Sequence, residues 1–188
     1  MTTFVALLRA VNVGSANRIK MDRLRAACVA AGYTDAATYI QTGNIILTST
    51  QSAVVVRCRV ERLITDEFDM SISAVIRTAN QMTTIANVHP LDRAPSPAPP
   101  AEPDIAKLFV VFLAGSPSAA AERTFAQAAA MAAPDDEVLV DGSEVYVRYA
   151  IGAGTTRLTA AIWNKLGVPA TARNWNVTRR LAELGAGH

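Results

Sequence analysis

Histidine is scarce in this 188-residue sequence, which contains only His89 and His188. One lies in a proline-rich stretch and the other at the C-terminus, so they are not expected to form a general-base pair or a zinc site. The Gly-x-Ser-x-Gly nucleophile motif does not occur. The two glycine-rich phosphate motifs, Gly-x-x-x-x-Gly-Lys-Ser/Thr and Gly-x-Gly-x-x-Gly, are also missing. We therefore predict no metal and no cofactor, and whether the protein is an enzyme stays open.

Cysteine and long apolar runs are scarce as well. The two cysteines, Cys28 and Cys58, fall in predicted helices at positions that suit a core. This is typical of a reduced, cytosolic protein, with a disulfide between them as the alternative. No stretch of about 18 apolar residues occurs, and the first residues, which have no basic region and are interrupted by Arg9, predict a strand rather than a signal peptide. We expect a soluble, cytoplasmic protein with no membrane partner.

Acidic residues are scarce at both ends of the sequence, so the charge is unevenly distributed along the chain. The net charge is +2. Residues 1–44 carry five basic and two acidic side chains (+3), and residues 148–188 carry six and one (+5). The middle, residues 45–147, is left with seven basic and thirteen acidic side chains (−6). This asymmetry favours an anionic partner for the two ends if they meet in space, with ordinary surface charge as the alternative.

Hydrophobic periodicity predicts the order β-α-β-β-α twice. In the first half, we expect elements at residues 3–10, 20–31, 36–41, 44–48, 52–68, 71–77 and 80–88. In the second half, we expect them at 105–113, 118–131, 137–140, 144–149, 155–166 and 172–184, with at most a vestigial strand near 168–171. This order is that of the ferredoxin-like split βαβ unit, so the predicted class is α+β.

Six prolines between residues 89 and 104 mark the clearest boundary in the chain. We predict an N-terminal ferredoxin-like half (1–88), a Pro-rich linker (89–104) and a C-terminal ferredoxin-like half with an extra C-terminal helix (105–188). The first and third strands of each half are expected to lie side by side and parallel. On that basis the turn at 41–44 lies at the opposite end of the sheet from the loop around Gly14.

Two loops rich in small residues precede predicted helices. The loop at residues 11–20 contains Gly14 and ends in Arg18 and Lys20, and the loop at 149–157 ends in Arg157. Backbone N–H groups at a helix start form a natural anion site. Each loop is therefore a candidate phosphate site, or else a plain connection. One loop with one arginine supports only about millimolar affinity.

The segment at residues 171–180 combines an aromatic ring with arginines and amides. Trp175 falls off the apolar stripe of the predicted last helix, which we expect to contain Val177, Leu181 and Leu184. An exposed Trp175 would stack on a base; alternatively it fills an interface between the halves. Residues 155–184 also fit a helix-turn-helix, although a tryptophan suits the major groove poorly. The acidic run at 135–137 predicts a solvated turn.

Several of these stretches resemble one bacterial family, called domain of unknown function 1697. The similarity lies in FVALLRAVNVG (4–14), Lys20-Met21 with Leu24-Arg25, YIQTGNI (39–45) and KLGVPATARNWN (165–176). The resemblance implies an α+β fold and brings no established activity. Ala10 and Ser15 depart from the glycines that are typical of the family, Thr155-Thr156-Arg157 stands in place of Arg-Ser-Lys, and Val177-Thr178 in place of Thr-Val.

The candidate binding residues combine the family-like polar positions with the cations of the two loops. They are Arg9, Asn12, Gly14, Arg18, Lys20, Gln41, Asn44, Arg157, Arg173, Asn174, Trp175 and Asn176. The leading hypothesis is a binding module for a phosphate-bearing ligand, a nucleotide or nucleic acid. The alternatives are an enzyme acting on a small anionic substrate, and motifs that are purely structural and stabilise an interdomain or dimer interface.

Overall fold

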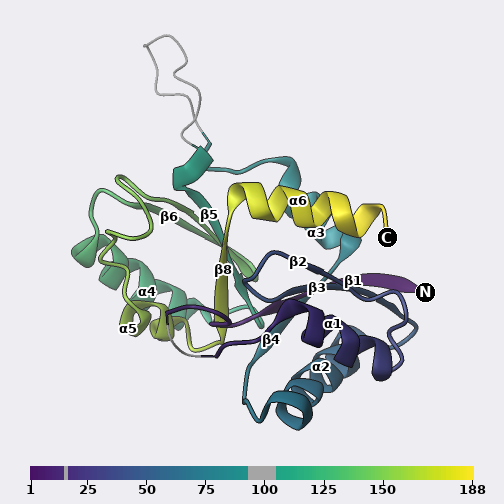
Figure 1. The fold of residues 1–188 in the computed structure, drawn as a ribbon. Coiled ribbons are helices and arrows are strands. Elements are labelled where there is room, and N and C mark those ends of the chain that lie inside the picture. The colour runs from purple at the N-terminus through teal and green to yellow at the C-terminus, as the bar shows by residue number, and fades with distance from the viewer. Residues whose placement is uncertain (15–16, 93–104) are drawn as a thin grey trace. The chain divides into compact units, whose positions relative to one another are not determined.

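The computed structural model describes residues 1–14, 17–92 and 105–188, so most of the expected linker, residues 93–104, lies outside the described residues. Two four-stranded antiparallel sheets and their helices (Figure 1) confirm the α+β class. The chain divides into two compact units. Unit 1 contains Met1–Ile85 and Arg179–His188, and unit 2 contains Ala86–Thr178. The C-terminal ten residues, which the sequence analysis placed in the second half, thus group with the first.

Unit 1 is built on a sheet with the strand order β2-β3-β1-β4. Its elements are β1 (Thr2–Leu8), α1 (Met21–Ala30), β2 (Ala37–Tyr39), β3 (Asn44–Ser49), α2 (Ala53–Phe68), β4 (Ala74–Thr78) and the greater part of α3 (Ala79–Asn87). Alternate β1 residues face α1 and α2, whose apolar stripes end in Cys28 and Ile64, and together they form one core. Ser52 caps α2 by accepting a hydrogen bond from the Val55 N–H.

Unit 2 has the corresponding order β6-β7-β5-β8. Its elements are the 3₁₀ turn η1 (Ile105–Lys107), β5 (Leu108–Leu113), α4 (Ala119–Ala132), β6 (Glu137–Asp141), β7 (Glu144–Arg148), α5 (Ala160–Trp163), η2 (Asn164–Leu166), β8 (Ala170–Asn174) and the start of α6 (Trp175–Ala186). Phe125 and Ala129 of α4 pack in its core with Leu113 of β5. Within the part of the chain that the structure describes, strand β6 is an edge strand of this sheet and pairs with β7 alone.

The two units repeat each other at the level of single backbone hydrogen bonds, although no sequence repeat predicted this. The residue that ends the first strand donates to the turn before the third strand, and the next residue donates to the segment before the fourth. The four bonds are Leu8 N–H to Gly43 O (2.8 Å), Leu113 N–H to Ser143 O (2.8 Å), Arg9 N–H to Ser73 O (2.9 Å) and Ala114 N–H to Pro169 O (2.9 Å). Differences between the units can therefore be located residue by residue.

The first and third strands are adjacent but antiparallel, which corrects the expectation of parallel neighbours. In unit 1, Leu7 of β1 lies opposite Asn44 of β3. The chain reverses direction through α1, again through β2, and once more at the turn, so β3 must run opposite to β1. As a result, the loop that leaves β1 lies at the same end of the sheet as the turn that enters β3. That turn spans residues 40–43, since β2 ends at Tyr39.

The helix expected at 155–166 is also wrong in its first half, because helical structure begins only at Ala160. Local hydrogen bonds take the backbone donors that a helix would need. The Leu158 N–H donates to Thr156 Oγ1 (3.1 Å) and the Thr159 N–H donates to Arg157 O (2.8 Å).

A full strand, Ala170–Asn174, replaces the first residues of the helix predicted at 172–184. Its residues have modest β-propensity, but pairing with β5 overrides it. Because this strand separates the last two helices, the helix-turn-helix alternative is wrong. Helix α6 begins at Trp175, where the Val177 N–H donates to Asn174 Oδ1 at 2.8 Å, so Asn174 is its N-cap.

Burial in α6 follows a different stripe from the predicted one. Trp175, Thr178, Leu181 and Ala182 are buried, whereas Val177 is only half-buried. Thr178 is polar, but its hydroxyl donates to Asn174 O at 3.1 Å, so it can occupy the buried side. Because Val177 is not at the centre of the buried stripe, its use as a reference placed Trp175 on the wrong side of the helix.

The two cysteines are free, and only Cys28 is buried. Burial raises the pKa of the Cys28 thiol to about 11. Cys58 is exposed on α2, so the expectation of two core thiols is half wrong. Among the described helices, none is both long and apolar enough to cross a bilayer.

Candidate functional site

The connection from β1 to α1, residues 9–20, has an unusual backbone. Ala10, Asn12 and Asn17 have φ values of 52°, 54° and 50°, and Gly14 has 64°. Left-handed backbone costs a residue with a side chain about 1–2 kcal/mol, and such conformations persist only where their surroundings impose them. We name residues 9–20 the cationic loop, because they include Arg9, Arg18 and Lys20 and contain no acid.

The Asn12 side chain fixes the cationic loop in two directions. Its Oδ1 accepts from the Ile19 N–H at 2.9 Å, and its Nδ2 donates to Ile19 O at 2.9 Å and to Gln41 O at 2.7 Å. The last bond joins the loop to the 40–43 turn. The two motifs that the sequence analysis placed at opposite ends of the sheet are therefore adjacent.

Gly43 allows this close approach. A Cβ at this position would lie 2.9 Å from the Leu8 Cβ and 3.1 Å from the Val11 Cβ, and the backbone φ is +73°. Val11, a residue of the cationic loop, is buried over the turn. Asn44, which follows the turn, is fully buried and donates through Nδ2 to Tyr39 O at 3.0 Å. The turn is thus shaped to receive the loop.

Exposure divides the candidate residues into two groups. Seven are exposed, namely Arg9, Gly14, Arg18, Lys20, Gln41, Arg157 and Asn176. Five are buried or half-buried and use their polar atoms or rings inside the protein, namely Asn12, Asn44, Arg173, Asn174 and Trp175. The second group shapes the backbone, whereas within unit 1 the candidate cations and Gln41 are exposed to solvent.

Arg173 has an equivalent in the other unit. It is 6% exposed, and its Nη1 donates to Thr171 Oγ1 and to Ala172 O, both at 2.8 Å. Desolvation lowers its pKa to about 10. Arg77 of β4, at the same position relative to the first strand, is 7% exposed, and its Nη1 donates to Ile76 O at 2.8 Å. A feature that occurs in both units belongs to the shared architecture.

Trp175 is buried in unit 2, so it is not the exposed stacking ring that its helical angle predicted. Its ring makes an edge-to-face contact with the ring of His89, with the ring centroids 5.0 Å apart. His89 makes a similar contact with Tyr146, with the centroids 5.2 Å apart. His89 was expected in the linker, yet it is 2% exposed, and its Nε2 lies 3.1 Å from Phe109 O. Burial lowers the His89 pKa and raises that of Tyr146 to about 12. These rings form a packed aromatic cluster.

The second predicted loop, at 149–157, differs from the cationic loop in its charge. It borders a hollow of about 350 Å³ whose lining contains Arg157 together with Asp135 and Asp136. Asp136 binds the loop, because its carboxylate accepts from the Ala150 N–H at 2.8 Å and from the Thr156 hydroxyl. Asp135 and Glu137 are exposed, as expected for a solvated turn, whereas Asp136 of the same turn is half-buried. Two carboxylates beside one guanidinium disfavour a polyanion here.

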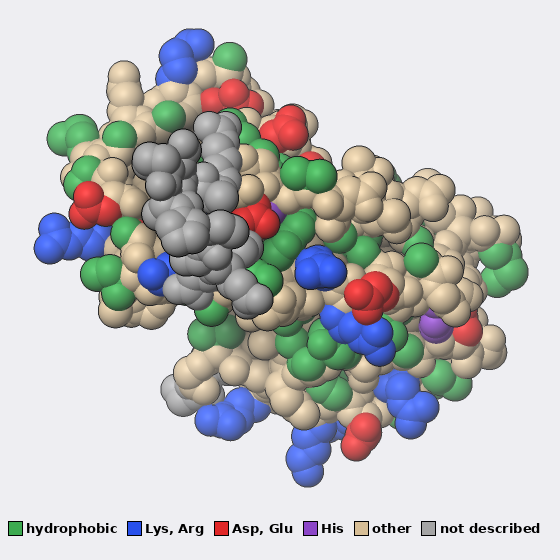
Figure 2. All heavy atoms as spheres, turned by 90° about the horizontal axis from the view of Figure 1, so that it is seen from above, with side chains coloured by type: hydrophobic (Ala, Val, Ile, Leu, Met, Phe, Trp, Pro, Cys, Tyr) green, Lys and Arg blue, Asp and Glu red, His purple; other side chains and the backbone are tan. Residues whose placement is uncertain are grey.

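Basic side chains do not gather in one patch on the face shown in Figure 2, where most of the described Lys and Arg residues are separated by neutral and apolar ones. The expectation that the two basic chain ends share an anionic partner stays a prediction. The sequence analysis missed the close contact at Gly43 and the role of Asp136 as an organising residue. A Thr-Gly pair and an acid before a strand are too common to indicate these roles without the contacts.

The fold and this loop define a class: an α+β protein with two antiparallel sheets of matching topology and one extended, cation-bearing connection. The family described as "Protein of unknown function (DUF1697)" matches residues 1–146, and the chain belongs to this family. The matched region ends before the closing stretch 165–176. No curated protein matches the sequence.

Among solved structures, the conserved bacterial protein SP0830 from Streptococcus pneumoniae is similar, with a TM-score of 0.66 and 18% identity over 99% of each chain. At this identity the likeness concerns the fold alone.

Proposed function

We propose that the protein binds a phosphate-bearing ligand, a nucleotide or nucleic acid, through the cationic loop and the 40–43 turn of unit 1. The observation that carries the proposal is the Asn12 side chain, whose bond to Gln41 O at 2.7 Å joins the two segments. Arg9, Arg18 and Lys20 are exposed on the joined segments, which contain no acid. Among the described residues, the Arg9 and Lys20 side chains have no ion-pair partner.

Preorganisation makes this loop a better binder than a flexible basic segment. Each hydrogen bond from a charged donor contributes about 1.5–3 kcal/mol, and two or three such bonds minus the cost of association support affinities between micromolar and millimolar. In the described parts of the loop, residues 9–14 and 17–20, Asn12 and Gly43 already fix the backbone, so binding does not have to order those residues. Because the loop carries three cations, it supports a ligand with several phosphates more strongly than a single anion.

For the C-terminal motif, we propose a structural role in place of ligand contact. Burial of Arg173 and Trp175 supports this, as does the equivalent Arg77. We also infer that each unit is a ferredoxin-like split βαβ unit. The sheet orders β2-β3-β1-β4 and β6-β7-β5-β8, all antiparallel, support that inference.

Two labelled probes test the proposal: a ribonucleoside triphosphate and a single-stranded oligonucleotide, titrated by fluorescence anisotropy at several salt concentrations. We expect R18Q and K20Q each to weaken binding about 5-fold to 30-fold and to lower the oligonucleotide salt slope by about 1. Arg62, an exposed arginine of α2 that pairs with Asp66, supplies the matched control R62Q, which should leave both unchanged.

The outcomes separate the sources of phosphate. Saturable binding of the triphosphate with a shallow salt dependence identifies a nucleotide site, whereas tight binding of the oligonucleotide alone identifies nucleic acid. R157Q should not weaken binding, because that arginine belongs to unit 2 and lines a hollow together with two carboxylates. If neither probe binds at low salt, or if R62Q lowers affinity as much as K20Q, the cationic loop is not a phosphate site.

A further inference from the structure

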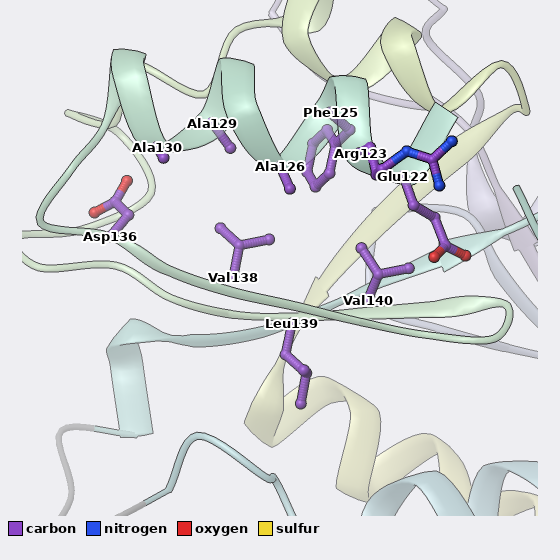
Figure 3. A pocket seen from close by; sticks show the side chains of 10 residues that line it. All are labelled: Glu122, Arg123, Phe125, Ala126, Ala129, Ala130, Asp136, Val138, Leu139 and Val140. Atoms are coloured by element: carbon purple, nitrogen blue, oxygen red, sulfur yellow. The ribbon is translucent and has the colours of Figure 1, made fainter. Parts of the chain in front are cut away.

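An apolar hollow between α4 and β6 belongs to no motif identified in the sequence. It has a volume of about 390 Å³ and lies entirely within unit 2. As Figure 3 shows, Val138 and Val140 point from β6 towards α4, while Leu139 points away. The facing side of α4 presents Ala126, Ala129 and Ala130, whose small side chains leave the space unfilled.

The strand that borders this hollow is a free edge. Strand β6 pairs with β7 on one side, and no other strand of the described residues (1–14, 17–92 and 105–188) pairs with its second side. An edge strand presents alternate backbone N–H and C=O groups that an extended chain can bind. Leu139 is 40% exposed, and Val138 and Val140 are only half-buried. The edge therefore offers hydrogen bonds and apolar contact together, which is the combination used in recognition by strand addition.

Charge selects the occupant. The hollow and strand carry Glu122, Asp136, Glu137 and Asp141 against Arg123. Arg148 of the neighbouring strand β7 pairs with Glu137, which brings the net charge of the region to −2. In Figure 3, Glu122 and Asp136 lie at opposite ends of the hollow. A second copy of this chain is disfavoured, because antiparallel pairing of two β6 strands places Glu137 opposite Asp141 and parallel pairing places like residues side by side. A basic segment has the complementary charge.

We propose that β6 and the α4–β6 hollow form a docking site for an extended basic peptide, in which apolar residues alternate with lysine or arginine. The peptide adds to β6 as a fifth strand of the sheet. On one of its faces the side chains project towards α4, where an aliphatic group enters the hollow beside Ala126 and Ala130. Its basic residues lie near the acids at the strand ends.

The test uses a fluorescent, end-blocked peptide of sequence Lys-Val-Lys-Leu-Lys-Val-Lys, titrated into the full chain at low salt. We expect saturable binding that is lost with the corresponding glutamate peptide. A version N-methylated on the backbone amides that face β6 should bind at least about tenfold more weakly, because it loses two hydrogen bonds of the added strand. Binding should also slow amide hydrogen exchange within Glu137–Asp141.

Matched variants separate the hollow from general charge attraction. A126L fills the hollow and should weaken binding about fivefold, whereas A120L, on an exposed position of α4 outside the hollow, should not. The double variant E137K/D141K should reverse the preference from the basic to the acidic peptide. The proposal is overturned if the N-methylated peptide binds equally well, if no binding saturates below about 1 mM, or if sedimentation shows a dimer that A126L disrupts.

Discussion

The two units solve the same connection in different ways, and the difference locates the specialised part of the molecule. In unit 2, five residues (114–118) lead from β5 to α4, whereas in unit 1 twelve residues (9–20) lead from β1 to α1. The hydrogen bonds at the start of both connections match. A helix can therefore follow the first strand of this fold after a short link, so the additional length in unit 1 is not needed to begin the helix.

The turns beside these two connections differ in the same way. In unit 1 the turn residue is Gly43, over which Val11 of the cationic loop packs, whereas its equivalent in unit 2 is Ser143, whose hydroxyl donates to Glu144. A side chain is tolerated where no loop approaches. Thus the long loop and Gly43 depend on each other. The left-handed backbone at Ala10, Asn12 and Asn17 costs conformational energy that the contacts of the loop must offset.

The largest effect is expected when the close contact is blocked. G43A should lower the free energy of unfolding by about 2–4 kcal/mol, because it combines a left-handed alanine with overpacking against Leu8 and Val11. The control is G142A in the unit 2 turn, where φ is +60° but no atom lies within 4 Å, so only about 1 kcal/mol is expected. Urea unfolding measures both. Equal losses would show that Val11 does not press on the turn.

A smaller effect is expected when the bond between loop and turn is removed. N12G keeps the left-handed backbone accessible but deletes three hydrogen bonds, so we expect a loss of about 1–3 kcal/mol. Amide hydrogen exchange at Ile19, the donor to Asn12, should accelerate more than exchange in unit 2. If protection at Ile19 is unchanged, the loop is held by Val11 and Gly43 alone, and its preorganisation does not depend on Asn12.

Sequence reasoning succeeded where local pattern decides structure. The ranges of α1 and α2 were predicted within a few residues, because apolar spacing and the Ser52 cap are local features. The resemblance to a family also directed attention to the cationic loop, whose role in binding stays a prediction.

It failed where a distant partner decides. Strand β8 forms because β5 pairs with it, and Trp175 is buried because His89, far away in the chain, lies against it. The adjacency of Gln41 and Asn12 depends on strand direction, which requires the order of the whole sheet. The hollow beside β6 forms because alanines of α4 face that strand. Hydrophobic periodicity cannot identify which strand a helix will face.

The smallest effect concerns an acid that braces the edge strand in each unit. Asp35 precedes β2 and accepts from the Thr48 hydroxyl and from the Thr48 N–H at 3.3 Å, much as Asp136 precedes β6 and accepts from Thr156 and Ala150. Burial alone would raise the Asp35 pKa, but the hydrogen bonds from Thr48 and the nearby His188 together lower it below its ordinary value.

Because the folded pKa of Asp35 is depressed, its contribution to stability is present above the unfolded pKa of about 3.9 and is lost as pH falls through the folded pKa. We therefore expect D35N to be less stable than the parent protein at pH 6 and to lose less stability between pH 5 and pH 3. The effect should be below about 1 kcal/mol, since the carboxylate is largely exposed to solvent. Urea unfolding across this pH range measures it. T48V, which removes the hydroxyl donor, should also lose less stability between pH 5 and pH 3 than the parent protein. If both variants lose as much stability over this range as the parent protein, Asp35 does not brace β2.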